Sequence, residues 1–174
     1  MSVTRLISLD DAAALAKLVQ ANRDFLAPWD PVRGDGYFTE AGQFADIQGS
    51  LSQYRQGIKL PHVILDESGT LAGRINLNNI VRGAFQSGSL GYWVSAAENG
   101  RGLATAAVRD MVRLAFGELR LHRVEAGTLV HNAGSQRVLE RNGFVRYGLA
   151  PRYLKIADRW QDHVLYQLLN TGPG

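Results

Sequence analysis

The sequence predicts an α/β domain of the α+β kind, in which helices flank one mixed β-sheet. Three observations favour this class. Apolar residues recur at helical spacing near the start of the chain and again over residues 103–119. Between these stretches the pattern changes to short strand-like runs separated by turn residues, which is typical of an antiparallel meander. After the second helical stretch a strand, a helix and two further strands follow, so we expect a single mixed sheet.

The first third of the chain is predicted to hold two helices joined by a loop. The first helix covers residues 8–22, and either Ser8 or Asp10 can cap it. In the loop at residues 25–31, two prolines bracket a tryptophan. The second helix is expected over residues 39–56.

The middle of the chain is predicted to form the meander. Its three strands cover residues 62–65, 70–80 and 90–95. A hairpin turn at residues 66–69 joins the first two strands, and a polar turn at residues 83–88 precedes the third.

The second half is predicted to contain a long amphipathic helix, a strand rich in β-forming residues, a short helix and two closing strands. In that order, they cover residues 103–119, 122–130, 133–142, 144–148 and 160–169. Gly143 stands where glycine commonly follows the end of a helix, which supports the boundary after the short helix.

Length and composition limit the class of protein. A chain of 174 residues is expected to form one domain over residues 1–174 with a sizeable core. Cysteine is absent, which excludes disulfides, thiolate metal sites and a cysteine nucleophile, and the scattered histidines predict no metal site. No apolar run approaches the roughly 20 residues of a membrane helix, and the start lacks the pattern of a signal peptide. We therefore expect a cytoplasmic enzyme or binding domain without a membrane partner.

The charges are unevenly distributed along the chain. Residues 88–174 carry eleven basic and seven acidic side chains, whereas residues 1–87 carry eight and nine. Nearly all of the basic excess is arginine, which suits bidentate contacts with phosphate oxygens. There is no basic tail and no basic stripe along a helix, so direct nucleic-acid binding is not expected.

The most informative local motif is Gly100-x-Gly102, which follows a strand and directly precedes the long helix. Glycines let the backbone approach a ligand, and the first turn of a helix offers unpaired N–H donors and the positive end of its dipole. A diphosphate would bind there, with the charge of Arg101 beside it. The alternative is that the two glycines merely turn the chain.

Other phosphate-binding motifs fit this loop less well. A dinucleotide site needs its glycines directly after the first strand of a βαβ unit and an acidic residue about 20 positions later, but this loop comes in mid-chain after a meander. A P-loop needs Gly-Lys-Ser/Thr, which does not follow here. A nucleotide-binding module that uses the same loop stays open as an alternative.

Several motifs together resemble the GNAT N-acetyltransferases. Residues 99–104 are similar to the acetyl-CoA loop of that family, and residues 132–144 to its Asn-x-x-Ser…Gly-Phe segment. The resemblance extends over nearly the whole chain. Four shorter segments are similar to the RimJ/RimL branch, which acetylates N-terminal amines of ribosomal proteins. They are residues 28–29, 90–93, 160–165 and 79–85. The segment at residues 79–85 is particularly like RimJ.

The resemblance implies a mixed, mostly antiparallel sheet that is splayed in the middle and flanked by helices. Acetyl-CoA would be the co-substrate, and no metal is implied. If a further strand lies near residues 3–7, strands 90–95 and 122–130 are the fourth and fifth, and the pantetheine arm would lie between them. The arm would form hydrogen bonds with backbone groups that would otherwise pair with a neighbouring strand. The residues implied to bind acetyl-CoA are Tyr92, Trp93, Val94, Asn99, Gly100, Arg101, Gly102, Leu103, Ala104, Thr105, Asn132, Ser135 and Arg141.

The resemblance assigns the chemistry to Ser135 and Asn132. Direct attack of an amine on a thioester releases a thiolate, which needs a proton donor nearby. The residue matching Ser135 is the proposed general acid of RimL-type members, and Asn132 would hydrogen-bond the cofactor arm. Capping of the short helix is the alternative role for both residues. Phe25, Trp29 and Tyr37 could line the acceptor pocket or serve only in packing.

Two positions depart from the family pattern. Asn99 stands where arginine or glutamine is usual, which could weaken a pyrophosphate contact. Ser89 stands where RimL-like relatives often carry glutamate, which puts a fixed carboxylate base in doubt. An α-amino group has a pKa of about 7.7–8.0, against about 10.4 for lysine, so water suffices to remove its last proton. The missing base therefore suits an N-terminal amine better than a lysine side chain.

We interpret the chain as an acetyl-CoA-dependent N-acetyltransferase that works through a ternary complex, without a covalent enzyme intermediate. Its acceptor is expected to be the N-terminal α-amino group of a ribosomal or other protein. Acetylation of a small amine is one alternative, and a catalytically inactive CoA-binding regulatory domain is another. The protein would act as a monomer or a homodimer.

Overall fold

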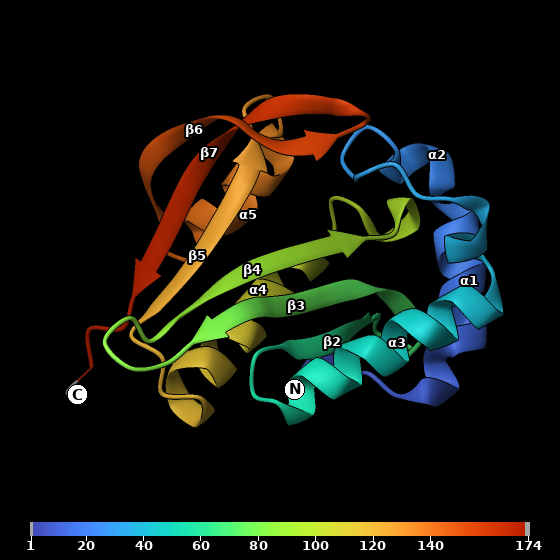
Figure 1. Cartoon of the computed structure of the whole chain (residues 1–174), viewed down its shortest axis with the longest axis horizontal. Helices are drawn as coiled ribbons and strands as arrows, with labels where there is room; N and C mark the ends of the chain where they lie inside the picture. The colour runs from blue at the N-terminus through green and yellow to red at the C-terminus, as the bar shows by residue number, and fades with distance from the viewer. Residues whose placement is uncertain (1, 173–174) are drawn as a thin grey trace.

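A computed structural model describes residues 2–172 and contains a seven-stranded mixed sheet flanked by helices (Figure 1). The strand order is β1-β2-β3-β4-β5-β7-β6, and of the neighbouring pairs only β4 and β5 run parallel. The strands are β1 Thr4–Leu6, β2 Leu60–Leu65, β3 Leu71–Val81, β4 Ser87–Val94, β5 Arg123–Leu129, β6 Val145–Ile156 and β7 Arg159–Leu169. The fold class expected from the sequence is confirmed.

Five α-helices accompany the sheet in the described residues. They are α1 Ala12–Ala21, α2 Arg23–Leu26, α3 Glu40–Arg55, α4 Leu103–Arg113 and α5 Ala133–Arg141. The helical path of α4 continues as a π-turn over Leu114–Glu118, so the predicted helix at 103–119 is present with a change of winding near its end. Short 3₁₀ turns cover Leu9–Asp11, Asp35–Phe38 and Ala96–Glu98.

The helices cover the two faces of the sheet unequally. Helices α4 and α5 lie behind the sheet, over the main core that includes Ile75, Leu90 and Met111. Helices α1 and α3 lie on the other face, over a smaller core around Ile47 and Val63. Figure 1 shows α1 and α3 in front of β2 and β3 only, so no helix covers the front of β4, β5 and β7.

The sheet divides at its centre into a V. Strands β4 and β5 pair only from Ser87 and Arg123 to Leu90 and Ala126, and beyond these residues they diverge (Figure 1). The other edge of β4 stays paired with β3 as far as Val94. The backbone groups of β4 after Leu90 that face β5 therefore have no strand partner, as the splayed sheet of the resemblance implied.

Three element boundaries differ from the sequence predictions. The loop at 25–31 begins inside a helical turn, because α2 extends to Leu26. Strand β4 begins at Ser87 rather than at residue 90. Strand β6 continues to Ile156 instead of ending near 148, because it pairs along its length with β7. The turn that joins them places Ala157 and Asp158 at positive φ, and this pair lacks the Asn-Gly signature of such turns.

Candidate active site

A cavity of about 390 Å³ opens at the mouth of the V. The end of β4, the first turns of α4 and α5, and the segment around α2 all contribute to its lining. Nine of the residues expected from the sequence to bind cofactor or acceptor line it: Phe25, Trp29, Tyr92, Trp93, Val94, Asn99, Ala104, Asn132 and Ser135. The structure adds Leu26, His131, Ala133, Gly134 and Val138.

Two hydroxyl groups meet on the wall of this cavity. Tyr92 Oη lies 2.8 Å from Ser135 Oγ and 3.3 Å from the Ser135 carbonyl oxygen, to which it donates. Burial raises the pKa of Tyr92 to about 12, and the hydrogen bond with Ser135 opposes that rise. The phenol is therefore protonated at neutral pH and can serve as a donor to Ser135.

Asn132 occupies the N-cap of α5. Its side-chain oxygen accepts a hydrogen bond of 3.1 Å from the backbone N–H of Ser135. The capping role considered from the sequence is therefore present for Asn132, because this bond satisfies a donor that the first turn leaves unpaired. The cap also fixes where Ser135 lies relative to Tyr92, so it contributes to the geometry of the hydroxyl pair.

The glycine loop before α4 forms an open cradle of backbone donors. Gly100 and Gly102 both have φ near 79°, a conformation that favours glycine, and Gly102 is the N-cap of α4 without a side-chain cap. A Cβ at either position would meet no atom within 4 Å, so the space above the loop is empty. Asn99 stabilises the loop, since its side-chain oxygen accepts from the N–H of Gly100 at 3.1 Å. The first turn of α4 is thus free to bind an anion.

The remaining cofactor candidates lie around this cradle. Leu103 and Thr105 belong to the first turn of α4, and the Thr105 carbonyl oxygen accepts a bond of 3.2 Å from Asn142. Arg101 lies 3.4 Å from Glu98 and lines a separate cavity of about 710 Å³ beside the β2–β3 turn. Arg141 is exposed in the last turn of α5 and does not line the cavity at the V.

A buried asparagine that sequence reasoning missed holds the end of β4. The side-chain oxygen of Asn22 accepts from the N–H of Ala96 at 2.8 Å and from Ser95 Oγ at 3.3 Å. Its side-chain nitrogen donates to the Leu18 carbonyl at 2.8 Å. Asn22 therefore ties α1 to the segment that leads into the glycine loop. No local pattern identifies this role, because the partners are more than 70 residues apart.

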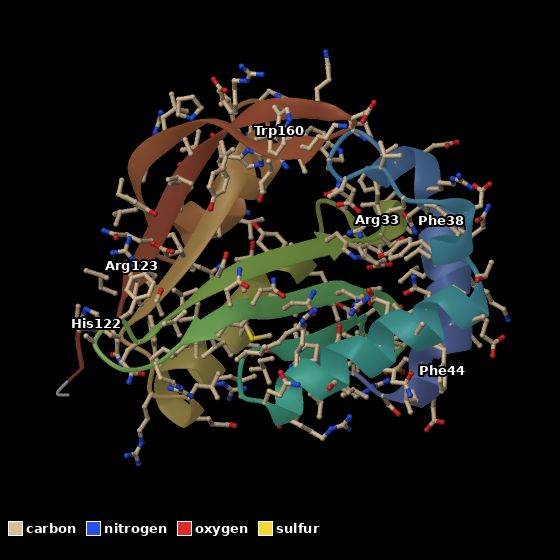
Figure 2. All side chains as sticks on the ribbon, viewed as in Figure 1. Arg33, Phe38, Phe44, His122, Arg123 and Trp160 are labelled. Atoms are coloured by element: carbon tan, nitrogen blue, oxygen red, sulfur yellow. The ribbon has the colours of Figure 1, made fainter. Side chains whose placement is uncertain are left out.

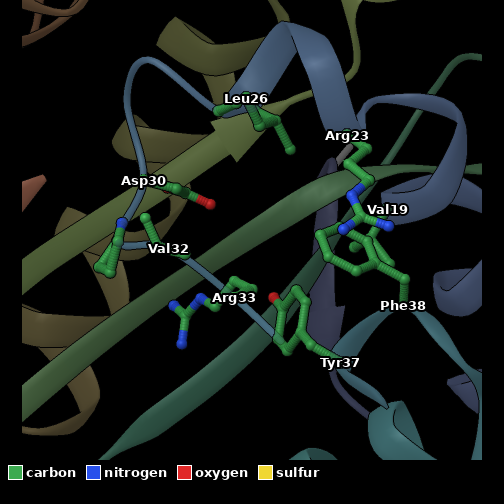
Figure 3. Close-up of a pocket in the computed structure, with 10 residues that line it drawn as sticks. Val19, Arg23, Leu26, Asp30, Val32, Arg33, Tyr37 and Phe38 are labelled. Atoms are coloured by element: carbon green, nitrogen blue, oxygen red, sulfur yellow. The ribbon is translucent and has the colours of Figure 1, made fainter. Parts of the chain in front are cut away.

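The aromatic acceptor candidates are divided between two pockets. Phe25 and Trp29 line the cavity at the V, where the Trp29 ring lies 5.5 Å from the His131 ring. Tyr37 instead lines an adjacent pocket of about 220 Å³ (Figure 3), where the Arg33 guanidinium lies 4.8 Å from its ring centre. In the same pocket, burial raises the pKa of Asp30.

Two further classes of site were sought in the described part of the chain. Within residues 2–172, no group of three or more histidine, aspartate or glutamate side chains is placed to hold a metal ion. No helix among these residues is both long and apolar enough to cross a membrane.

The fold and this site match one known class of protein. Residues 3–145 match the family described as the acetyltransferase (GNAT) domain, and the chain belongs to that family. It is accordingly an acyltransferase that uses acetyl-CoA as its co-substrate. The open edge of β4 and the uncapped start of α4 fit an extended amide-containing arm and a diphosphate, respectively.

Individual relatives come from the branch that the motifs indicated. The chain is 36% identical to a probable N-acetyltransferase, YjcK, of Bacillus subtilis, covering 95% of this chain and 92% of that protein. It is 34% identical to the ribosomal protein uS5-alanine N-acetyltransferase of Escherichia coli, over 95% and 86% of the two chains. The crystal structure of Mycobacterium smegmatis RimJ in complex with CoA-disulfide superposes with a TM-score of 0.91 at 32% identity, covering 95% of this chain and 80% of that one.

Proposed function

We propose that the protein transfers an acetyl group to the N-terminal α-amino group of a protein, with a ribosomal protein as the first candidate acceptor. The transfer occurs by direct attack within a ternary complex. The observation that carries the proposal is the Tyr92–Ser135 hydroxyl pair on the wall of the V-shaped cavity. The names of the relatives above support the acceptor class. We expect the reaction to take place in the cytoplasm, where such an acceptor is made.

The chain supplies three sets of groups to hold acetyl-CoA. The backbone of Gly91–Val94 on the open edge of β4 would pair with the amides of the pantetheine arm. The N–H groups at the start of α4 would bind the diphosphate. Asn132, at the start of α5, lines the same cavity and would hydrogen-bond the arm through its amide. When bound, acetyl-CoA provides a thioester that an amine can attack, with a thiolate as the leaving group.

Ser135 and Tyr92 hold the proton that the leaving sulfur needs. Tyr92 Oη is protonated at neutral pH and lies 2.8 Å from Ser135 Oγ, a contact in which either hydroxyl can donate. In the arrangement we propose, Tyr92 turns its single proton from the Ser135 carbonyl oxygen to Ser135 Oγ, which leaves the Ser135 proton free to point into the cavity. Ser135 is thus the general acid, and Tyr92 positions and polarises it. Because both side chains are fixed by the fold, the donor is oriented before the substrates arrive.

The acceptor enters past the aromatic side chains at the cavity mouth. Phe25 and Trp29 line the cavity with apolar rings, and His131 lies beside Trp29, a combination that suits the first residues of an extended peptide. A free α-amine has a pKa of about 7.7–8.0, so a substantial fraction of it is already neutral near physiological pH and it needs no strong side-chain base. A lysine ε-amine, with its higher pKa, would need one.

A thiol-release assay over three acceptors tests this function. The first is a peptide with a free N-terminal alanine, the second is the same peptide acetylated at its N-terminus with an internal lysine, and the third is a polyamine. We expect thiol release with the first peptide only, and mass spectrometry should place the acetyl group on its α-nitrogen. Reaction with the lysine peptide alone, or with the polyamine alone, would overturn the N-terminal assignment.

A further inference from the structure

A row of polar side chains crosses the open face of the sheet at the closed end of the V. Asn78 of β3 pairs with Ser89 of β4, Ser89 pairs with Glu125 of β5, and Glu125 pairs with Gln167 of β7. Paired residues on neighbouring strands project to the same face, about 5 Å apart. The row lies one residue before the last β4–β5 pair, Leu90 with Ala126.

The alternation along the strands sets the direction of this row. Leu90, Val124 and Ala126 are buried in the core beneath α4 and α5, so their immediate neighbours Ser89 and Glu125 project from the opposite face. That face carries no helix at this point, as Figure 1 shows. A polar row on an uncovered face beside the apex of the V is placed to meet a ligand that approaches from the side opposite α4.

Glu125 is the only acid in the row, and it is anchored through one oxygen. Its Oε1 accepts from Arg123 Nε at 2.9 Å and from Tyr147 Oη at 3.1 Å, and it lies 2.7 Å from Arg123 Nη2. Among the described residues, these bonds all use Oε1 and none uses Oε2. The Glu125 side chain is 30% exposed. One carboxylate oxygen is therefore fixed in place while the other is open to the face of the sheet.

The charges around Glu125 decide what it can accept. Arg123 is half-buried beside it, with its guanidinium 5.0 Å from the ring centre of Tyr147, and Figure 2 shows Arg123 at the closed end of the V. The shared Oε1 contacts hold the carboxylate in one orientation. A carboxylate has two acceptor oxygens, and a cation on the open face can bind the second one, Oε2.

We propose that Glu125 binds the ammonium group of the incoming acceptor at the apex of the V, and that Asn78 and Ser89 provide neighbouring polar contacts. The ligand class is a primary ammonium at the end of an extended chain. This inference rests on the proposed function, because it assigns a binding residue to the same reaction. Glu125 would hold the amine at the apex of the V, and water takes the proton when the amine becomes neutral.

The competing explanation is that Glu125 serves only to neutralise Arg123. The two explanations predict different effects for Arg123→Gln. If the pair is purely structural, Arg123→Gln and Glu125→Gln should change the KM for the acceptor equally. If Glu125 binds the acceptor, Arg123→Gln keeps the carboxylate, which Tyr147 still contacts, so the KM should rise less than it does in Glu125→Gln.

Steady-state kinetics with the free-amine alanine peptide test the proposal. For Glu125→Gln, we expect the peptide KM to rise about tenfold, as the loss of one charge-assisted hydrogen bond implies, while the Kd for CoA stays within twofold of wild type. Glu118→Gln is the matched control, since Glu118 is exposed in the π-turn on the other side of the molecule's core, and its KM should not change. Melting temperatures verify that each variant is folded.

A charge-relocation variant provides a second readout. In Ser89→Glu/Glu125→Gln the carboxylate moves one strand along the same row, so the peptide KM should return to within about threefold of wild type. An unchanged KM in Glu125→Gln, or an equal rise in Arg123→Gln, would overturn the assignment of Glu125. If the wild-type protein acetylates no N-terminal peptide, the proposed function itself fails, and that outcome is separate from the behaviour of Glu125.

Discussion

The hydroxyl groups of Tyr92 and Ser135 lie 2.8 Å apart, although 43 positions separate the two residues in the chain. Tyr92 belongs to the strand that forms one arm of the V, and Ser135 belongs to the first turn of α5 on the other arm. Their contact bridges the two arms at the level of the cavity. The proton donor that we propose for the reaction is therefore built from both sides of the splayed sheet.

Removal of the Ser135 hydroxyl should separate chemistry from cofactor binding. For Ser135→Ala we expect kcat to fall about 100-fold, at the lower end of the range for loss of a general acid, because the leaving thiolate loses its donor. The Kd for CoA, measured by calorimetry, should change less than threefold. A variant with unaltered kcat would remove Ser135 from the mechanism.

Tyr92→Phe should have a smaller effect than Ser135→Ala. Ser135 keeps its own proton in this variant and loses only the donor that orients it, so kcat should fall about tenfold. Tyr54→Phe is the control, because Tyr54 is an exposed residue of α3 far from the cavity. Equal activity in the two tyrosine variants would contradict the positioning role of Tyr92.

The glycine loop gives a prediction about CoA affinity. In Gly102→Ala the new side chain is forced into a left-handed conformation, which costs roughly 1 kcal/mol, and its methyl group projects at the start of α4. We expect at least a tenfold weaker Kd for CoA by calorimetry. Gly49→Ala, within α3 and without nearby atoms, should leave the Kd unchanged. Unaltered CoA binding in Gly102→Ala would place the diphosphate elsewhere.

Loss of the buried Asn22 side chain should destabilise the protein. Asn22→Ala leaves the N–H of Ala96 without its partner, and buried unpaired polar groups cost about 1–3 kcal/mol each. The free energy of unfolding, measured with urea, should fall by that amount. Gln20→Ala removes an exposed amide from the same helix and should change it by less than about 0.5 kcal/mol.

Stability should depend on pH through His62. Burial lowers the pKa of His62 to about 4, and Asp110 opposes this shift while Arg5 adds to it. The unfolded chain, with an ordinary histidine pKa near 6.5, binds the proton first as pH falls, so stability is present above pH 6.5 and is lost towards pH 4. We expect His62 to account for a loss of about 2 kcal/mol between pH 7.5 and 5.

The variant His62→Gln isolates this contribution. Its free energy of unfolding should fall less steeply over the same pH interval than that of the wild type, when both are measured with urea. Parallel pH profiles for the two proteins would show that another group causes the loss. Thr4 is the hydrogen-bond partner of His62 at 3.2 Å, so a glutamine can retain one polar contact there.

The parts of the site that follow one another in the chain could be predicted from local patterns. Gly100 and Gly102 before an amphipathic helix indicated a phosphate cradle, because positive φ and helix termini are local properties. Capping of α5 was one of the two roles considered for Asn132, and the structure shows this cap. The extent of β6 could not be predicted, since its second half is a strand only through pairing with β7.

What the sequence determined by itself was the class of fold, the order of most elements and the glycine loop before α4. These depend on periodicity, capping and turn chemistry within a few residues. Only the tertiary structure decided that Tyr92 supports Ser135, that Asn22 holds the end of β4, and that Glu125 faces the apex of the V. The physical reason is that strand register and the packing of one element on another bring together residues far apart in the chain, and no local pattern records which of them will meet.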